Sequence, residues 1–464
     1  MEYVSTRGTA PVLDFESAML TGLARDGGLY VPRSWPTLSH ETIAGFAGQR
    51  YETVAEAVIT PFLGGAFGQP TVARLIERAY AKFEHPARAP LAQIDVDTWV
   101  LELHRGGTLA FKDFAMKLIG QMFEETLTRR GERVTIVGAT SGDTGSAAIE
   151  AFRGLDAVDV FILFPHGRVS EVQRRQMTTP REANVHALAI EGSFDDCQAL
   201  VKAMFNDFAF RDAQKLAAVN SINWARVLAQ VVYYFTAAVA LGAPHRPVAF
   251  SVPTGNFGDI FAGWVARQMG LPIDRLVIAT NENDILHRCL TTGEYAVSTV
   301  KQTTAPSMDI QVSSNFERAL FDAYDRDAGA ITGLMNSLKQ SGGFTLAEPA
   351  RAKLRAEFDS ARVSEAETAE TIRRVYGDSA YLLDTHTAIG VHAASQVART
   401  DGVPMVCLGC AHAAKFPDAV EAACGVRPAL PPALSDLYDR DERMTVLPND
   451  LSAVESHIQS KASP

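Results

Sequence analysis

Long apolar runs, a surplus of positive charge and a dense set of cysteines are all missing from this chain of 464 residues. The most apolar stretch, residues 227–241, is interrupted by Gln230 and is too short to cross a bilayer, so we expect a buried helix there. The formal net charge of −11 argues against a general nucleic-acid or anionic-membrane partner. The N-terminus is polar and charged, so we expect no secretory signal peptide.

Cysteines are few and odd in number, namely Cys197, Cys289, Cys407, Cys410 and Cys424. Such a set is not a disulfide framework, so we expect a reducing compartment, the cytoplasm. The Cys407–Cys410 pair leaves two alternatives open. A zinc site would need a second ligand pair, and a redox pair would need exposure, whereas Cys407 lies in an apolar run. We expect no metal, because scattered histidines such as His386 and His392 are usually structural.

The length predicts two or three domains, and the pattern changes near residue 90. Residues 1–90 contain helical runs at 53–59 and 71–83, and residues 85–90 include two prolines typical of a linker. We therefore expect an N-terminal domain of residues 1–90, followed by a region of residues 91–464 with its own architecture.

Beyond the linker, short apolar runs alternate with helices and glycine loops. The expected strands are residues 133–137, 160–164, 248–252, 276–279 and 405–408. Runs of this kind predict a parallel sheet covered on both faces, with ligands at the carboxyl ends of its strands. Residues 331–374 are richer in charge, and we expect helices without strands there.

One glycine loop, residues 255–259, follows the run at 248–252 and precedes a helix. Glycines let backbone N–H groups approach an anion closely, and the helix N-terminus adds a favourable dipole, so a phosphate is the natural ligand. A tight turn without any ligand is the alternative that this loop alone leaves open.

A second glycine loop, residues 138–145, carries the hydroxyl groups of Thr140, Ser141 and Thr144. It is no P-loop, because Asp143 occupies the position of the lysine, and its glycine spacing does not match the dinucleotide fingerprint. Hydroxyl and N–H groups together suit a carboxylate or a second phosphate.

Lys112 has apolar and aromatic neighbours within residues 107–114. A lysine in an apolar site has a lowered pKa and can act as nucleophile or base, although a surface lysine on a helix is the alternative. A desolvated lysine together with a phosphate loop on a parallel sheet is what pyridoxal phosphate needs, since its aldehyde forms a Schiff base with lysine.

The stretch 108–114 resembles the lysine motif of the threonine synthases, a family within the fold type II, tryptophan-synthase-β-like pyridoxal-phosphate enzymes. The resemblance covers nearly the whole chain, in the family's order, through residues 3–8, 23–32, 140–145, 220–223, 254–259 and 412–416. It implies an α/β fold with two parallel-sheet αβα domains, interleaved within residues 91–464, and an additional N-terminal region.

The resemblance also implies a role for each matching position. Lys112 would be the catalytic lysine that holds the cofactor, with Phe111 beside it. The cofactor phosphate would lie against Gly255, Asn256, Phe257, Gly258 and Asp259. The substrate α-carboxylate would be received by Thr140, Ser141, Asp143 and Thr144. The substrate phosphate would be bound by Asn220, Ser221 and Arg226, whose planar guanidinium suits a phosphate.

One position departs from the family pattern. The family usually has a threonine two residues before the histidine of the 412–416 motif, where its hydroxyl meets the pyridine nitrogen of the cofactor. Here that residue is Cys410, and a thiol is the weaker hydrogen-bonding group. His412 is also followed by Ala413 instead of the commoner proline.

The implied reaction converts O-phosphohomoserine and water to threonine and phosphate, which is the last step of threonine biosynthesis and a carbon–oxygen lyase reaction. Three alternatives stay open: a phospholyase that yields 2-ketobutyrate, a serine or threonine dehydratase that would not need Arg226, and a non-catalytic cofactor-binding protein. We expect a small-molecule substrate, no nucleic-acid or membrane partner, and a monomer or homodimer.

Overall fold

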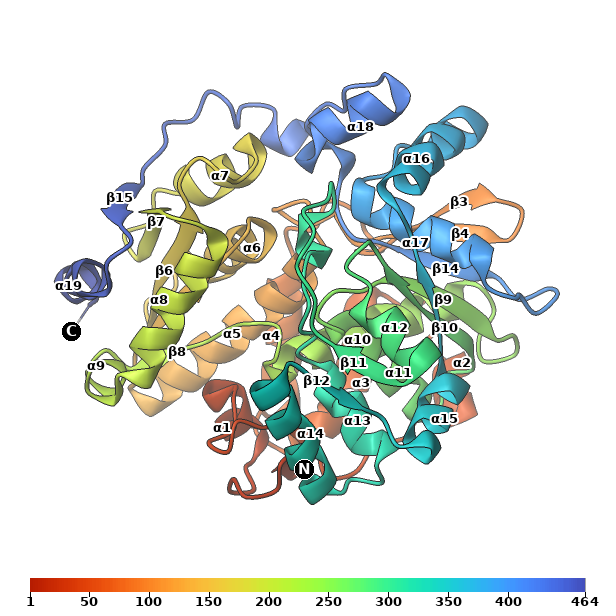
Figure 1. Cartoon of the computed structure of the whole chain (residues 1–464), viewed down its shortest axis with the longest axis horizontal. Coiled ribbons are helices and arrows are strands. Elements are labelled where there is room, and N and C mark those ends of the chain that lie inside the picture. The colour runs from red at the N-terminus through yellow and green to blue at the C-terminus, as the bar shows by residue number, and fades with distance from the viewer. Residues whose placement is uncertain (464) are drawn as a thin grey trace.

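Two separate β-sheets organise the computed structural model, which describes residues 1–463 (Figure 1). The larger sheet has six strands in the spatial order β13 (Phe358–Arg362), β10 (Ile273–Thr280), β9 (Val248–Pro253), β14 (Met405–Gly409), β4 (Thr98–Glu102) and β3 (Leu91–Asp95). All neighbours in it are parallel except β3, which runs antiparallel to β4.

The smaller sheet is wholly parallel. Its five strands lie in the order β15 (Thr445–Pro448), β7 (Val185–Glu191), β6 (Val158–Pro165), β5 (Val134–Ala139) and β8 (Leu216–Ala217). All eight residues of β6 are buried, as expected for a central parallel strand covered on both faces. The chain leaves the larger sheet after β4, builds most of the smaller one, and returns at β9, and β15 near the C-terminus rejoins the smaller sheet.

Helices cover both faces of each sheet. On the larger sheet, α17 (Thr385–Gln396) packs against β9, β10 and β14, while α11 (Gly258–Gln268) packs against β9 and β10. On the smaller sheet, α6 (Asp143–Phe152) packs against β6, and α8 (Phe194–Asn206) packs against β5 and β6. Helix α5 (Lys112–Arg130) contacts both α6 and α10 (Trp224–Ala240), and so joins the two halves (Figure 1).

The remaining elements are shorter or lie outside these layers. The other α-helices are α1 (Phe15–Thr21), α2 (His40–Ala44), α3 (Tyr51–Leu63), α4 (Gln69–Tyr80), α7 (Glu171–Thr178), α9 (Phe208–Ala213), α12 (Ile285–Thr292), α13 (Phe316–Ala323), α14 (Ala328–Ser341), α15 (Glu348–Glu357), α16 (Glu365–Ser379), α18 (Pro417–Cys424) and α19 (Leu451–Lys461). Two small antiparallel pairs are β1 (Tyr3–Ser5) with β2 (Tyr30–Pro32) and β11 (Glu294–Ala296) with β12 (Gly343–Thr345). The 3₁₀ turns are η1 (Pro306–Met308), η2 (Ala413–Lys415) and η3 (Pro432–Leu434).

The five strands expected from the sequence are confirmed as β5, β6, β9, β10 and β14. The buried helix expected at 227–241 is confirmed as α10, which ends at Ala240. The expectation of no strands within residues 331–374 is wrong, because β12 and β13 lie there. The charged residues of β13 interrupt the apolar run by which a strand is recognised in the sequence. This strand is the edge of the larger sheet, where Asp359 pairs with Arg275, and edge strands tolerate charge.

Residues 1–90 share their core with the rest of the chain. Helices α3 and α4 are confirmed near the helical runs expected from the sequence, and they pack on α10 and α5, respectively. Buried residues of α3 and α4 belong to one continuous hydrophobic cluster with those of α5, α10 and the larger sheet. A separate N-terminal domain ending at residue 90 stays a prediction. Within residues 1–463, no helix is long and apolar enough to span a membrane.

The N-terminal strand is fixed by the hydroxyl of Tyr3, which suggests a test of this shared core. The buried hydroxyl donates to the Phe62 carbonyl (2.7 Å) and accepts from Trp224 Nε1 (3.1 Å). Because Tyr3→Phe leaves both buried partners unsatisfied, we expect the free energy of unfolding in urea to fall by about 2 kcal/mol. The control Tyr438→Phe alters an exposed ring and should change it by less than about 0.5 kcal/mol. Equal effects of the two substitutions would contradict the anchoring role of Tyr3.

Candidate active site

A cavity of about 730 Å³ opens where loops after strands of both sheets meet. Most of the expected site residues line it: Phe111, Lys112, Asp143, Thr144, Ser221, Arg226, Gly255, Asn256, Phe257, Gly258, Asp259 and Cys410. The glycine loops after β5 and β9 and the loop after β14 therefore converge, as their positions at carboxyl ends of parallel strands predict.

Lys112 is held by a loop that is pinned to a distant part of the chain. The backbone N–H of Phe111 donates to the Cys410 carbonyl (2.8 Å), and that of His412 donates to the Leu109 carbonyl (3.0 Å). Leu109 has a φ of 60°, a left-handed conformation that is uncommon for leucine and reflects the tight turn before α5. The two hydrogen bonds place the lysine next to Cys410 although about 300 residues separate them.

Lys112 is the first residue of α5 and only 8% exposed. Burial lowers the pKa of its amine, and Asp143, whose Oδ2 lies 3.6 Å from Nζ, opposes that shift. The partial positive charge of a helix N-terminus also disfavours an ammonium group there. The alternative of a surface lysine is excluded, and the amine faces the cavity as a usable nucleophile or base.

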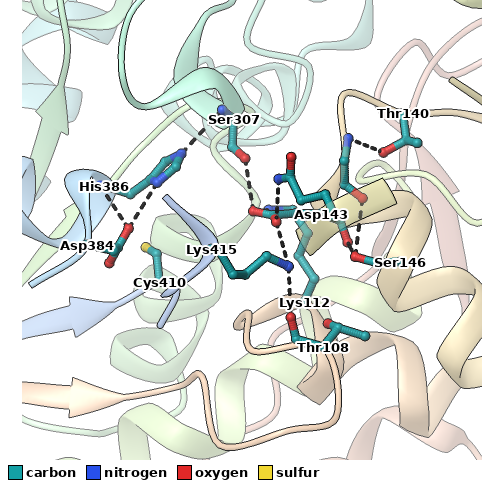
Figure 2. Close-up of polar contacts among 12 residues, drawn as sticks. Thr108, Lys112, Thr140, Asp143, Ser146, Ser307, Asp384, His386, Cys410 and Lys415 are labelled. Carbon is teal, nitrogen blue, oxygen red and sulfur yellow. Dashed lines mark hydrogen bonds and ion pairs between the residues drawn. The ribbon is translucent and has the colours of Figure 1, made fainter. Parts of the chain in front are cut away.

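Asp143 lies between several donors (Figure 2). Its Oδ1 accepts from Lys415 Nζ (2.8 Å) and Gln173 Nε2 (2.9 Å), and its Oδ2 accepts from Ser307 Oγ (3.2 Å). Burial alone would raise the pKa of this carboxyl, but Lys415 and Lys112 together hold it well below its usual range. The side chain is thus a permanent anion, which would repel a substrate carboxylate. Any carboxylate bound here has to use the N–H groups at the start of α6.

Three expected substrate residues do not line the cavity. The buried Thr140 hydroxyl accepts from the N–H groups of Gly142 and Gly145, both at 2.9 Å, so it shapes the loop from within. Asn220 is exposed, and its side chain accepts from the Ile222 N–H (3.3 Å). Ser141 is half-buried next to the cavity lining. Their direct contact with substrate stays a prediction.

Two carbonyl groups of the loop 255–259 accept hydrogen bonds from residues that precede α13. Ser313 Oγ donates to the Gly255 carbonyl (2.6 Å), and the backbone N–H of Asn315 donates to the Asn256 carbonyl (3.0 Å). Phe257 precedes α11 with a φ of 63°, and no side chain caps the first turn of that helix. The N–H groups at this helix start are therefore available to an anion in the cavity. A Cβ on Gly255 would lie 3.0 Å from the Ser307 carbonyl oxygen, a tight contact that favours glycine at this position.

Asp259 is held by two tyrosines in an apolar setting. Tyr233 and Tyr234 donate their hydroxyls to its Oδ1 at 2.5 and 3.1 Å, and within the described residues the buried Oδ2 has no partner. Burial raises the pKa of this carboxyl to about 6, although both tyrosines act against that shift. A carboxylate beside a phosphate is unfavourable, so any contact of this residue with a phosphate would use its backbone N–H.

Arg226 is a buried cation without a carboxylate partner in residues 1–463. It is 5% exposed and lies in the first turn of α10, and within the described residues its guanidinium makes a single hydrogen bond, from Nη1 to the Val219 carbonyl (3.1 Å). Burial lowers the pKa of the guanidinium to about 10, so it still carries its charge near neutrality. An unpaired buried guanidinium that faces a cavity is suited to an anionic ligand.

Cys410 lines the cavity as a neutral thiol, since burial raises its pKa well above the usual value. Its Sγ lies 3.7 Å from the Leu408 carbonyl, to which the thiol can donate. Cys407 is also buried and free, which argues against the redox-pair alternative. In the part of the chain that the structure describes, no three His, Cys, Asp or Glu side chains gather in a way that could hold a metal ion.

Sequence reasoning missed several cavity residues. Ser307 and His386 line the cavity, and the His386 ring joins Asp384 through Nδ1 (3.0 Å) and accepts from the Ser307 N–H through Nε2 (3.3 Å) (Figure 2). Gln230 lies one turn after Arg226, so helical spacing could have indicated it. Lys415 belongs to the motif 412–416, but no local signal in the sequence indicates that it reaches Asp143.

The residues present fit pyridoxal phosphate. The cavity contains a buried lysine amine, an uncapped helix start behind a glycine loop, and the Cys410 thiol in one enclosure. An aldehyde can join the amine, a phosphate can lie on the helix start, and a ring can lie between them.

The unusual setting of Asp259 predicts a pH effect on stability. Because the folded chain binds this proton up to about pH 6 while the unfolded chain releases it at lower pH, the group reduces stability as pH rises toward 6. The free energy of unfolding of wild type relative to Asp259→Asn should therefore fall between about pH 4 and pH 6 and stay level at higher pH. Urea titrations at several pH values measure it, and a difference that is constant with pH would contradict the raised pKa.

Family models match most of the chain. A model described as "Threonine synthase N terminus" matches residues 2–80, "Pyridoxal-phosphate dependent enzyme" matches residues 85–334, and "Threonine synthase, C-terminal" matches residues 387–458.

Known threonine synthases and their solved structures are similar to this chain over nearly the full length of both. The threonine synthase of Pseudomonas aeruginosa is 55% identical over 99% of this chain and 98% of its own. The crystal structure of PLP-bound threonine synthase from Brucella melitensis is 59% identical, with a TM-score of 0.98 and full coverage of both chains. The yeast threonine synthase structure is 39% identical, with a TM-score of 0.95 over 99% of this chain and 98% of its own. The chain therefore belongs to the threonine synthase family of pyridoxal-phosphate-dependent enzymes.

Proposed function

We propose that this chain forms threonine and phosphate from O-phosphohomoserine and water, with Lys112 as its catalytic residue. The observation that carries the choice of substrate is Arg226, a buried guanidinium without a carboxylate partner in the described chain, in the same cavity as the glycine loop and the lysine. A cofactor phosphate can occupy only one of these two anion sites. A substrate that carries its own phosphate explains the presence of the second anion site.

The cofactor would be held by residues of three elements. Lys112 would hold its aldehyde, the helix start behind Gly255 and Asn256 its phosphate, and Cys410 would face its ring nitrogen. When bound, pyridoxal phosphate supplies an electron-accepting ring that spreads the negative charge left at the substrate Cα.

The substrate would be oriented by its two anionic groups. The N–H groups at the start of α6, next to Thr144, would receive the α-carboxylate, while Arg226 and Ser221 would bind the phosphate. Fixing both ends places Cα, Cβ and Cγ inside the cavity near Lys112, and orientation of this kind contributes strongly to rate.

Proton transfers would depend on the Lys112 amine. Burial lowers its pKa, so a larger fraction of the amine is neutral near neutral pH and can accept the Cα proton at Nζ. The same amine can return a proton to carbon at the end of the reaction. A second proton would leave Cβ as the phosphate departs from Cγ, and the Arg226 charge would stabilise the departing phosphate. Water would then add its oxygen at Cβ, and protons would return to Cγ and Cα.

We further propose that the protein acts in the cytoplasm, as a monomer or homodimer. The support for a reducing compartment is that all five cysteines are free. Sedimentation of the purified protein distinguishes the two oligomeric states.

Replacing Lys112 tests the catalytic assignment. Lys112→Ala removes the amine that moves the proton, so turnover of O-phosphohomoserine should drop by at least about 10³-fold. In wild type, borohydride reduction should fix the cofactor to the peptide that contains Lys112, as detected by mass spectrometry. The control Lys117→Ala alters a lysine of the same helix that pairs with Glu150, and should keep near wild-type turnover. Full turnover in Lys112→Ala would refute the assignment.

Replacing Arg226 tests the substrate phosphate site. Loss of charge-assisted hydrogen bonds in Arg226→Met should raise KM for O-phosphohomoserine about 10- to 100-fold, while the affinity for pyridoxal phosphate changes little. The control Arg25→Met alters an exposed residue. A large loss of cofactor affinity with an unchanged KM would instead assign Arg226 to the cofactor phosphate.

A further inference from the structure

Lys415 is the most deeply buried cation near the cavity, with none of its surface exposed. It ends the 3₁₀ turn η2, after β14, and its ammonium group has three partners. Nζ lies 2.8 Å from Asp143 Oδ1, donates to the Thr108 carbonyl (2.8 Å), and donates to Gln176 Oε1 (3.1 Å). Its three protons are thus all satisfied, and its orientation is fixed.

Asp143 therefore stands between two lysines. Lys415 approaches Oδ1, while Lys112 lies 3.6 Å from Oδ2 (Figure 2). The closer and better hydrogen-bonded lysine is Lys415, which does not line the cavity, and the looser one is Lys112, which does. The arrangement separates a fixed charge from a lysine amine that can change its charge.

Lys415 is needed because Lys112 loses its positive charge when it acts as a base. An amine that accepts a proton from carbon must first be neutral, and a neutral Lys112 no longer compensates Asp143. A buried carboxylate without a counter-ion costs several kcal/mol, and would take up a proton or raise the proton affinity of its neighbour. Lys415 removes that cost, because it stays paired with Asp143 whatever the state of Lys112.

We propose that Lys415 is a positioning residue that acts through Asp143: it keeps this carboxylate charged and in place while the Lys112 amine is neutral, and so sets the basicity of Lys112. The inference rests on the proposed role of Lys112 but concerns a residue outside the cavity. Asp143 correspondingly serves as a fixed anion beside the amine, and its side chain receives no substrate carboxylate.

Other charges act on the amine from the elements around it. Asp143 on α6 and the Cys410 thiol, if ionised, raise the proton affinity of Lys112, while Arg226 on α10 and Lys415 lower it. Asp259 on α11 is also close enough to interact with Lys112. The effect of Lys415 is therefore separable by substitution, because the remaining charges stay unchanged.

Substitutions of the two partners should act in opposite directions. Lys415→Met removes a positive charge and leaves Asp143 paired with Lys112 alone, so the pKa of Lys112 should rise by about one unit. Asp143→Asn removes the anion, so the pKa should fall. In the double variant both charges are lost, and the pKa should return to within about half a unit of the wild-type value.

Trace labelling with acetic anhydride measures these pKa values in the full-length protein freed of cofactor. Only the neutral amine reacts, so the labelling rate of the Lys112 peptide against pH, followed by mass spectrometry, gives the midpoint. Near-UV circular dichroism verifies the fold, and Lys415→Gln replaces Lys415→Met if the methionine variant does not fold. The control Gln176→Leu removes a hydrogen-bond acceptor of Lys415 but no charge, and should leave the midpoint unchanged.

The outcomes separate the possibilities. The proposal is supported if the labelling midpoint of Lys112 shifts in opposite directions in the two single variants and the shifts cancel in the double variant. It is also supported if the acidic limb of the kcat–pH profile moves to higher pH in the Lys415 variant loaded with cofactor. An unchanged midpoint in the Lys415 variant overturns it. A midpoint that rises equally in the single and double variants also overturns it, because loosening of the site would then be the cause. If pyridoxal phosphate fails to protect Lys112 from the label, the proposed function fails, while the four midpoints still decide the role of Lys415.

Discussion

The structure depends on keeping one lysine amine out of water. Lys112 stands at the positive end of a helix and lines the cavity, where burial disfavours its charge. Such a group persists only if its surroundings are rigid. The loop before it is tied to the loop after β14 by backbone hydrogen bonds from Phe111 and His412, and the neighbouring Asp143 is fixed by donors on each side. The strain at Leu109 is tolerated because this framework determines the turn.

The fold supplies this framework by bringing the carboxyl ends of two sheets together. The loops after β5 and β9 each lead into a helix start whose N–H groups suit an anion, and Arg226 on α10 adds a fixed positive charge. Under the proposed function, these three groups around a single amine suit a phosphorylated cofactor together with a phosphorylated amino acid. The family membership of the chain and the geometry of its cavity therefore point to the same chemistry.

The sequence reveals features whose cause is local. The β-branched runs of β5, β6 and β9 and the glycine loops after β5 and β9 could be recognised because each signals its structure within a few residues. Edge strand β13 was missed because its charges are tolerated at the rim of a sheet. Ser307 and Lys415 could not be linked to Asp143, since each is more than 150 residues away and only the packing of the two sheets brings them together. The tyrosine pair at Asp259 escaped notice for a similar reason, because helices α10 and α11 have to pack before it forms.

The proposed assignment of this cavity rests on the turnover of O-phosphohomoserine to threonine. The most direct measurement incubates the purified protein, loaded with pyridoxal phosphate, with O-phosphohomoserine, and separates all products while the visible spectrum is followed. Threonine and phosphate should form in equal amounts, with a spectral change of the bound cofactor when substrate is added. Phosphate accompanied by 2-ketobutyrate instead of threonine, or no product from a protein that binds the cofactor, would contradict the assignment.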